Sequence, residues 1–198
     1  MKKRLGVNID HVATLRNARG EKHPDPYTSA LDVLKAGANS ITIHLREDRR
    51  HIKDIDLKTL SSNKSIPINL EIASDPKMVK IALKNKPSFI CLVPEKRNEI
   101  TTEGGLNLKK NKNKIKKILE VFNRNNIRTS LFINPSIKDI ELSKILGSKC
   151  IEIHTGNISN QIKQKKNYSK ELNKIKKCAF YAKKIGLEVH AGHGMDYK

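Results

Sequence analysis

The segment from His44 to His51 combines residue types that can bind an anion and transfer a proton. It holds two histidines and three arginines within eight residues, directly after an apolar run. Arginine binds phosphate or carboxylate through paired hydrogen bonds, and histidine changes its charge near neutral pH. A charged loop can equally form internal salt bridges in solvent, so this segment alone leaves both interpretations open.

Two glutamates interrupt apolar runs, where a charged side chain is costly. Glu71 lies within Ile68–Ala73, and Glu152 lies within the run that starts at Cys150. Burial disfavours the charged form of a carboxyl group, which suits such a group to general acid or base catalysis near neutral pH. A structural ion pair with an arginine or lysine of the next strand is the alternative for each glutamate.

Two further clusters place polar groups beside glycines or basic residues. In Ala191–Gly194, His193 stands between two glycines, where backbone N–H groups can approach a phosphate closely. The run Asn8–His11 is followed by Arg16 and Arg19. Histidine and carboxylate groups can also bind a metal ion. The sequence has no H-E-x-x-H and no C-x-x-C pattern, so no metal site is expected.

Short apolar runs rich in Ile, Val and Leu predict the strands that would carry these groups. Such runs are typical of strands buried on both faces of a parallel sheet. The predicted strands are Leu5–Asp10, Ser40–Leu45, Ile68–Ala73, Phe89–Pro94, Thr129–Asn134, Cys150–Thr155 and Glu188–Gly192. Amphipathic stretches predict helices over Pro26–Lys35, Asp54–Ser62, Asp75–Lys84, Lys112–Asn125, Ile137–Leu146 and Ser169–Lys184. Asp25 followed by Pro26 is typical of a helix start.

The repeat of strand, helix and strand predicts right-handed βαβ units and a parallel sheet, either open or closed into a barrel. No G-x-G-x-x-G or Walker pattern supports the common nucleotide-binding folds. Ionisable or amide residues stand at nearly every predicted strand end. In a barrel these ends meet at one mouth, where the catalytic groups of such folds lie. We therefore predict an α/β fold of the (β/α)8 TIM-barrel type.

The predicted strands are too few for a complete barrel, which has eight strand–helix units and usually about 250 residues. The sequence ends at Lys198, directly after the last predicted strand. We expect residues 1–198 to form a single TIM-barrel domain with about seven of the eight strands, lacking the final helix, strand and helix.

The net charge of +20 is the most unusual bulk property of the chain. Lysine and arginine neutralise phosphates, so nucleic-acid binding is one interpretation. Aromatic residues make up only 4% of the chain and do not interleave with the basic ones, which favours compositional drift instead. No apolar run is long enough for a membrane span, and three scattered cysteines fit a reducing cytosol. We expect a cytoplasmic protein that binds neither nucleic acid nor membrane.

Six stretches, in the same order along the chain, resemble the pyridoxine 5'-phosphate synthase family. They are Gly6–Gly20, His44–Ile52, Leu92–Arg97, Thr101–Gly105, Glu152–Gly156 and Ala191–Gly194. The resemblance implies a transferase of vitamin B6 biosynthesis that condenses 1-deoxy-D-xylulose 5-phosphate with 3-amino-2-oxopropyl phosphate. It further implies two phosphorylated substrates, no cofactor and a homo-oligomer.

The resemblance also implies roles for individual residues. His44 and Glu71 would be proton acceptors, His193 a proton donor, and Glu152 would stabilise charge in the transition state. The residues that would hold the deoxyxylulose phosphate are Asp10, His11, Arg46, His51 and Thr101. Those that would hold the amino-oxopropyl phosphate are Asn8, Arg19 and Gly194.

Three alternatives stay open beside the synthase. The first is a truncated, inactive homologue, because the family's last strand carries a Gly-His pair for the second substrate's phosphate and this sequence ends before it. The second is a basic nucleic-acid-binding α/β protein. The third is a metal-dependent barrel lyase or aldolase, which would lose its activity to a chelator.

Overall fold

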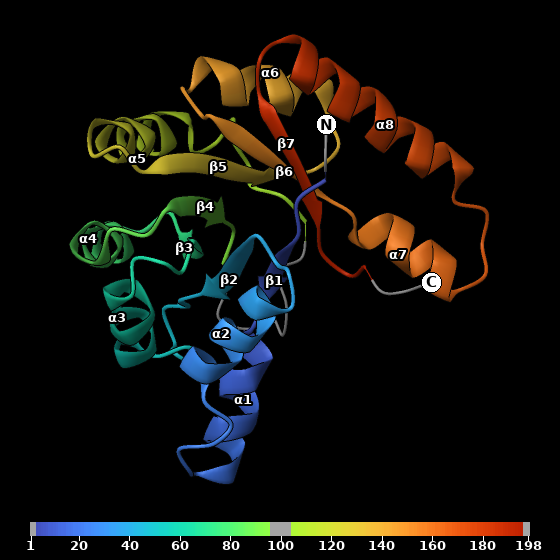
Figure 1. Cartoon of the computed structure of the whole chain (residues 1–198). Coiled ribbons are helices and arrows are strands. Elements are labelled where there is room, and N and C mark those ends of the chain that lie inside the picture. The colour runs from blue at the N-terminus through green and yellow to red at the C-terminus, as the bar shows by residue number, and fades with distance from the viewer. Residues whose placement is uncertain (1–2, 96–103, 196–198) are drawn as a thin grey trace. The chain divides into compact units, whose positions relative to one another are not determined.

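The computed structural model of the chain describes residues 3–95 and 104–195. The chain divides into two compact units, the first made of Met1–Cys91 and Asn125–Ile127 and the second of Leu92–Arg124 and Arg128–Lys198 (Figure 1). In both units strands alternate with helices along the chain. Within each unit neighbouring strands follow the order of the chain.

The first unit begins with a short strand and contains the first half of the strand–helix repeat. Its elements are β1 (Gly6–Asn8), α1 (Asp10–Arg19), α2 (Pro26–Lys35), β2 (Ser40–His44), α3 (Asp54–Ser62), β3 (Ile68–Ala73), α4 (Pro76–Asn85) and the start of β4 (Phe89–Val93). β1 pairs with β2 and β2 with β3, both in parallel. Helix α2 contacts α3, and α3 contacts α4.

The second unit repeats the pattern of alternating strands and helices. Its elements after the end of β4 are α5 (Lys112–Arg124), β5 (Arg128–Ile133), α6 (Ile137–Ile145), β6 (Cys150–His154), α7 (Gly156–Lys163), α8 (Ser169–Lys184) and β7 (Glu188–Gly192). β5 pairs with β6 and β6 with β7, both in parallel. The long helix α8, red in Figure 1, contacts α6, α7 and β7.

The strands of the first unit sort their side chains by polarity. Successive side chains of a strand point to opposite faces of the sheet. One face of β2 and β3 carries Thr42, His44, Asn69 and Glu71. The other face carries the buried apolar side chains Ile41, Ile43, Leu70 and Ile72. Alternate positions of β2 and β3 therefore hold polar residues, so these two strands are apolar on one face only.

The second unit shows the same division. One face of its three paired strands carries Ser130, Phe132, Cys150, Glu152, His154, Glu188 and His190. The opposite face carries Leu131, Ile133, Ile151, Ile153 and Val189. The polar groups that stood out in the sequence therefore lie on a common face within each unit.

Several helix starts are explained by capping side chains. The Asp25 carboxylate accepts hydrogen bonds from the backbone N–H groups of Tyr27 and Thr28, and Pro26 occupies the first helical position. Asp75 caps α4 in the same way. These side chains satisfy backbone donors that a helix start leaves unpaired. The predicted helix start at Pro26 is thus confirmed.

Two helices were not predicted, and both directly follow strands. Helix α1 begins at Asp10, where the prediction continued the first strand, so that strand ends at Asn8. Helix α7 begins at Gly156, directly after β6. The apolar periodicity of α1 is weak, and α7 is only eight residues long, so neither gave a clear helical pattern in the sequence. In the part of the chain that the structure describes, no helix is long and apolar enough to cross a membrane.

Candidate active site

Asp10 connects the end of β1, the start of α1 and the end of β2. Its Oδ1 accepts a hydrogen bond from the backbone N–H of His44 at 2.8 Å. Its Oδ2 accepts one from Asn8 Nδ2 at 2.9 Å, and its own N–H donates to Asn8 Oδ1 at 2.8 Å. Asp10 is only 7% exposed. These bonds therefore hold a buried carboxylate at the carboxyl ends of two neighbouring strands.

His44 and Glu71 face each other across β2 and β3. They are register partners, and His44 Nδ1 lies 3.9 Å from Glu71 Oε2. His44 is buried and Glu71 is half-buried. The separation exceeds a direct hydrogen bond, but catalytic contacts are often long without substrate and shorten when it binds. A pair placed in this way can exchange protons with a substrate atom that lies between the two groups.

His51 lies beside this pair, and its surroundings favour the neutral form of its imidazole. Its Nδ1 accepts a hydrogen bond from the backbone N–H of Ile52 at 2.9 Å, so this nitrogen carries no proton. Burial lowers the pKa of His51, Asp10 raises it, and the positive charge of Arg46 lowers it, with a net shift below the ordinary value. The ring centroid is 6.0 Å from that of His44. His51 can therefore donate from Nε2 to a phosphate or hydroxyl oxygen.

The charged segment after β2 is buried at one end and forms salt bridges at the other. Arg46 is only 3% exposed, and its Nε lies 3.3 Å from Asp48 Oδ1. Arg50 binds Asp48 Oδ2 at 2.6 Å. Burial raises the pKa of Asp48, but the hydrogen bonds from Arg50 and Arg46 outweigh it and lower the pKa below its usual range. Asp48 thus stays ionised and anchors both guanidinium groups.

Two of the predicted binding residues, His11 and Arg19, are exposed on α1. Arg19 pairs with Glu21 at 3.1 Å, and His11 Nδ1 lies 3.4 Å from Thr14 Oγ1. The structure does not bring these two side chains into the buried cluster around Asp10. Their roles in binding stay predictions.

In the second unit, three aromatic rings gather around the end of β6. The ring centroids of His154 and His193 are 4.9 Å apart, and Phe132 lies 5.3 Å from His154 and 6.0 Å from His193. Burial lowers the pKa of both histidines, and the charge of His193 lowers that of His154 further. Both rings are therefore neutral at neutral pH, a form that can accept a proton or donate one from a single nitrogen.

The loop that carries His193 is held by Thr155. The Thr155 hydroxyl lies within hydrogen-bond distance of the carbonyl oxygens of Gly192, at 2.6 Å, and of His193, at 2.7 Å. His193 itself has a φ of 84°, a left-handed conformation that is uncommon outside glycine. The hydroxyl thus fixes a strained turn that directs the imidazole toward His154.

Glycines leave room for the polar groups of this cluster. A Cβ atom at Gly192 would lie 2.6 Å from Glu152 Oε1, and one at Gly156 would lie 2.7 Å from His154 Nε2. Neither separation is possible for a real side chain. Glu152 therefore lies directly against the backbone of β7, and the two histidine rings pack over the start of α7.

The remaining predicted residues are Gly194 and Thr101. Gly194 is exposed, follows His193 and has a φ of 73°. Thr101 lies outside the described residues. The structure thus gathers Asn8, Asp10, His44, Arg46, His51 and Glu71 in the first unit. In the second unit Gly194 follows His193, and Glu152 lies against Gly192.

His154 and Thr155 contribute to the site but were not among the predicted site residues. His154 stands two positions after Glu152, so the two side chains share one face of β6. This two-residue spacing was visible in the sequence and could have identified His154 as a site residue. Thr155 gave no such signal, because its partner is a turn 37 residues away.

Protonation of His51, His154 and His193 should destabilise the folded chain. The pKa values of His51, His154 and His193 are lowered, so the unfolded chain takes up these protons first as the pH falls. Stability rises with pH wherever the unfolded state binds more protons. The melting temperature should therefore fall once the pH drops below about 6.5, the ordinary histidine value. Thermal unfolding followed at a series of pH values measures this loss.

The control for this prediction is a pair of substitutions. His154→Asn should flatten the pH dependence, whereas His23→Asn, at an exposed position between α1 and α2, should leave it unchanged. A melting temperature that stays constant between neutral pH and about pH 5, well below the ordinary histidine pKa, would show that the rings do not resist protonation.

Solved structures similar to this one place the fold among the TIM-barrel proteins. The 3-keto-L-gulonate-6-phosphate decarboxylase of Vibrio cholerae matches with a TM-score of 0.63, covering 98% of this chain and 80% of that chain at 12% identity. The YdjI aldolase of Escherichia coli K12 matches with a TM-score of 0.55, covering 96% and 74% at 10% identity. At such low identity these matches show the fold alone. They confirm an α/β fold of the TIM-barrel type, of which residues 3–95 and 104–195 form seven strands.

Much closer similarity exists to curated proteins. The pyridoxine 5'-phosphate synthase of Pelagibacter ubique is 62% identical over 196 residues, which are 99% of this chain and 82% of that protein. The synthase of Rhodopseudomonas palustris strain BisB18 is 50% identical over 98% of this chain and 77% of its own length. The family model described as pyridoxal phosphate biosynthesis protein PdxJ matches residues 5–198. The chain therefore belongs to the PdxJ family of pyridoxal phosphate biosynthesis proteins.

Proposed function

We propose that the chain joins 1-deoxy-D-xylulose 5-phosphate to 3-amino-2-oxopropyl phosphate to form pyridoxine 5'-phosphate, phosphate and water. This is the reaction of pyridoxine 5'-phosphate synthases, the proteins that it resembles over nearly its whole length. The observation that carries the proposal is the His44–Glu71 pair, which lies across two parallel strand ends beside the buried groups Asp10, Arg46 and His51.

The first unit offers the groups that a phosphorylated keto sugar requires. Arg46 brings a guanidinium that can bind phosphate in a forked geometry, and His51 can donate from Nε2. Asp10 can accept a hydrogen bond from a sugar hydroxyl while it keeps its bonds to Asn8 and His44. These groups support binding of the deoxyxylulose phosphate at the ends of β1 and β2.

The reaction requires proton transfers at several atoms, and each needs a positioned group. Attack of the amine on the ketone loses water and leaves an imine. Loss of phosphate removes a proton from carbon and is followed by addition of water, which supplies the hydroxymethyl group of the product. Closure of the ring then removes a further proton from carbon and loses water. In our proposal His44 and Glu71 accept these protons. Because the two groups are neighbours, one can release the proton that it has taken up while the other accepts the next one.

The second unit supplies the remaining roles. We assign proton donation to His193 and stabilisation of developing positive charge to Glu152, whose carboxylate lies against the backbone of β7. His154 contacts the His193 ring and keeps it oriented. Asn8, Arg19 and Gly194 are assigned to the amino-oxopropyl phosphate. The assembly of several chains into an oligomer is part of the same proposal.

The direct test is turnover by the purified chain. Incubation with both substrates should release inorganic phosphate and form pyridoxine 5'-phosphate, identified by mass spectrometry. Omission of either substrate should abolish both signals. The Pelagibacter ubique synthase serves as the positive control. If that protein forms the product and this chain, folded under the same conditions, forms none, the proposed activity is wrong.

A further inference from the structure

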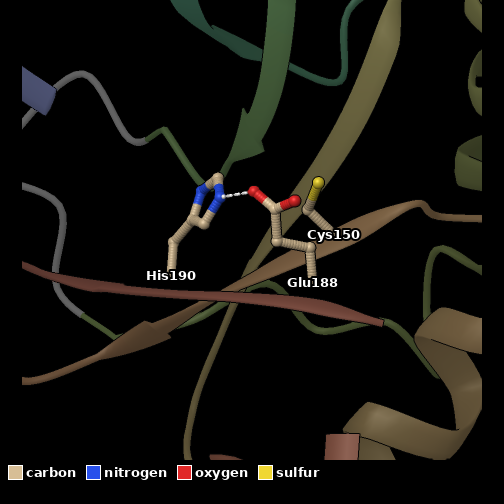
Figure 2. Close-up of side chains that lie close together, drawn as sticks. All are labelled: Cys150, Glu188 and His190. Carbon is tan, nitrogen blue, oxygen red and sulfur yellow. Dashed lines mark hydrogen bonds and ion pairs between the residues drawn. The ribbon is translucent and has the colours of Figure 1, made fainter. Parts of the chain in front are cut away.

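Cys150, Glu188 and His190 bring a thiol, a carboxylate and an imidazole together in the second unit (Figure 2). One ligand atom from each residue lies within 4.8 Å of the other two. None of the three has a role in the reaction proposed above.

The strand register creates this cluster. Cys150 of β6 is the register partner of Glu188 of β7, so their side chains leave the sheet side by side on one face. His190 follows Glu188 by two positions and therefore points to the same face. Figure 2 shows the Glu188 carboxylate between the imidazole and the thiol. The arrangement is thus fixed by backbone pairing and does not rely on a loop.

The three groups form the mixed sulfur, nitrogen and oxygen ligand set that zinc accepts. Zinc binds thiolate, imidazole and carboxylate in tetrahedral sites, and a site with three protein ligands keeps a fourth position for water. Magnesium and calcium prefer oxygen ligands, so a thiolate in the ligand set makes them poor candidates for this site. We propose that Cys150 Sγ, Glu188 Oε1 and His190 Nε2 bind a divalent cation of the zinc type.

The imidazole and the carboxylate require only a small adjustment to bind such an ion together. His190 Nε2 lies 2.6 Å from Glu188 Oε1. Two ligands that each bind zinc at about 2.0–2.1 Å in a tetrahedron stand about 3.3 Å apart. The imidazole and the carboxylate must therefore separate by about 0.7 Å, which side-chain rotation at half-exposed positions allows.

The carboxylate of the cluster is held in place by a neighbouring strand. Arg128 of β5 forms an ion pair with Glu188 Oε2, which leaves Oε1 toward His190. A hydrogen-bonded carboxylate of this kind is common around metal sites. Cys150 is 1% exposed, and a thiolate buried to that extent needs a cation beside it.

Binding must displace protons. The thiol of Cys150 becomes a thiolate and releases one proton to solvent. The ligating Nε2 of His190 must also be free of hydrogen, so the ring carries a proton only on Nδ1. Affinity for the ion should therefore rise with pH. This dependence separates a ligand site from a surface that merely attracts cations.

The test uses cobalt(II), which takes zinc sites and is visible by its absorption. The full chain, without an affinity tag and treated with chelator, is titrated with cobalt(II). We expect one equivalent to bind and to give a thiolate-to-cobalt charge-transfer band in the near ultraviolet. Added zinc should remove that band, and its intensity at a fixed cobalt concentration should grow as the pH rises.

Matched variants identify the ligands. Cys150→Ser should abolish the charge-transfer band, and His190→Asn should weaken cobalt binding by at least about 10-fold. Cys178→Ser, the same substitution at another buried cysteine, should change neither. The circular dichroism of each variant checks its fold. If Cys150→Ser is unfolded, the cobalt affinity of His190→Asn is the test of the proposed ligands.

Two results would overturn the proposal. The first is the absence of a charge-transfer band in the folded wild-type chain, which would mean that Glu188 and His190 form only an ion pair. The second is a band that persists in both Cys150→Ser and His190→Asn. Neither readout involves turnover, so failure of the metal site and failure of the synthase activity are distinguished.

Discussion

Replacement of His44 or Glu71 by glutamine should lower turnover by about 10²- to 10⁴-fold, the range for loss of one general acid–base group. Glutamine keeps much of the size and polarity of either side chain but cannot exchange a proton at neutral pH. The two groups lie 3.9 Å apart on one face of the sheet, so each variant removes one half of the same proton-transfer pair. Steady-state phosphate release with both substrates measures the loss.

The double variant sharpens this test. If His44 and Glu71 act as a unit, the double variant should be little slower than the slower single variant, because groups that act together are not additive. Glu47→Gln is the matched control, since it makes the same change on an exposed side chain two residues after Leu45. It should keep nearly all of the turnover. Wild-type rates in both single variants, with unchanged melting temperatures, would show that the pair is structural.

Much of the order of elements was predictable because turn-forming residues bound the apolar runs. Ile68–Ala73 and Glu188–Gly192 were predicted as strands and are strands with the same bounds. Pro26–Lys35 was likewise predicted as a helix, because Asp25 and Pro26 give an unambiguous start. In these segments local propensity and the final fold agree.

Helix α1 shows where such reasoning failed. Its start is determined by Asn8, whose side-chain oxygen accepts the N–H of Asp10 and turns the chain from strand into helix. The apolar residues of the segment are few, and Leu15 is exposed. Without a clear apolar stripe, the polar cluster was interpreted as the end of a longer strand.

The proximity of His44 and Glu71 was predictable, but the detailed geometry around them was not. The strand-end positions of His44 and Glu71 suggested that they are neighbours, because parallel strands end at a common edge. The bond between Asp10 and the His44 backbone joins residues 34 apart and depends on how β1 and β2 align. The contact of His154 with His193 likewise arises only when β6 and β7 pair.

The proposed metal site illustrates the same limit. Glu188 and His190 share a strand face by their spacing, but Cys150 joins them only through the register of β6 with β7. A shift of one residue would turn the thiol to the opposite face of the sheet. The three residues match no local pattern, so the expectation of no metal site rested on motifs that this arrangement does not use.

Loss of the Asp10 carboxylate should both destabilise the chain and weaken substrate binding. Asp10→Ala removes the acceptor for the His44 N–H and for Asn8 Nδ2 in a place that is almost closed to solvent. An unsatisfied buried donor costs about 1–3 kcal/mol, so the free energy of unfolding should fall by about that amount. Urea denaturation measures it. Asp32→Ala, on an exposed face of α2, should change it by less than about 0.5 kcal/mol.

Asp10→Asn separates the hydrogen bonds from the charge. Its side-chain oxygen can still accept the His44 N–H, so this variant should lose less stability than Asp10→Ala. It removes the negative charge 3.9 Å from His51 Nδ1, a charge that raises the pKa of that ring. The pKa of His51 should therefore fall further below its ordinary value, as followed by NMR titration, and the KM for the deoxyxylulose phosphate should rise. If Asp10→Ala unfolds at the wild-type urea concentration, or the His51 titration is unchanged in Asp10→Asn, Asp10 does not connect the two strand ends in the way that its hydrogen bonds indicate.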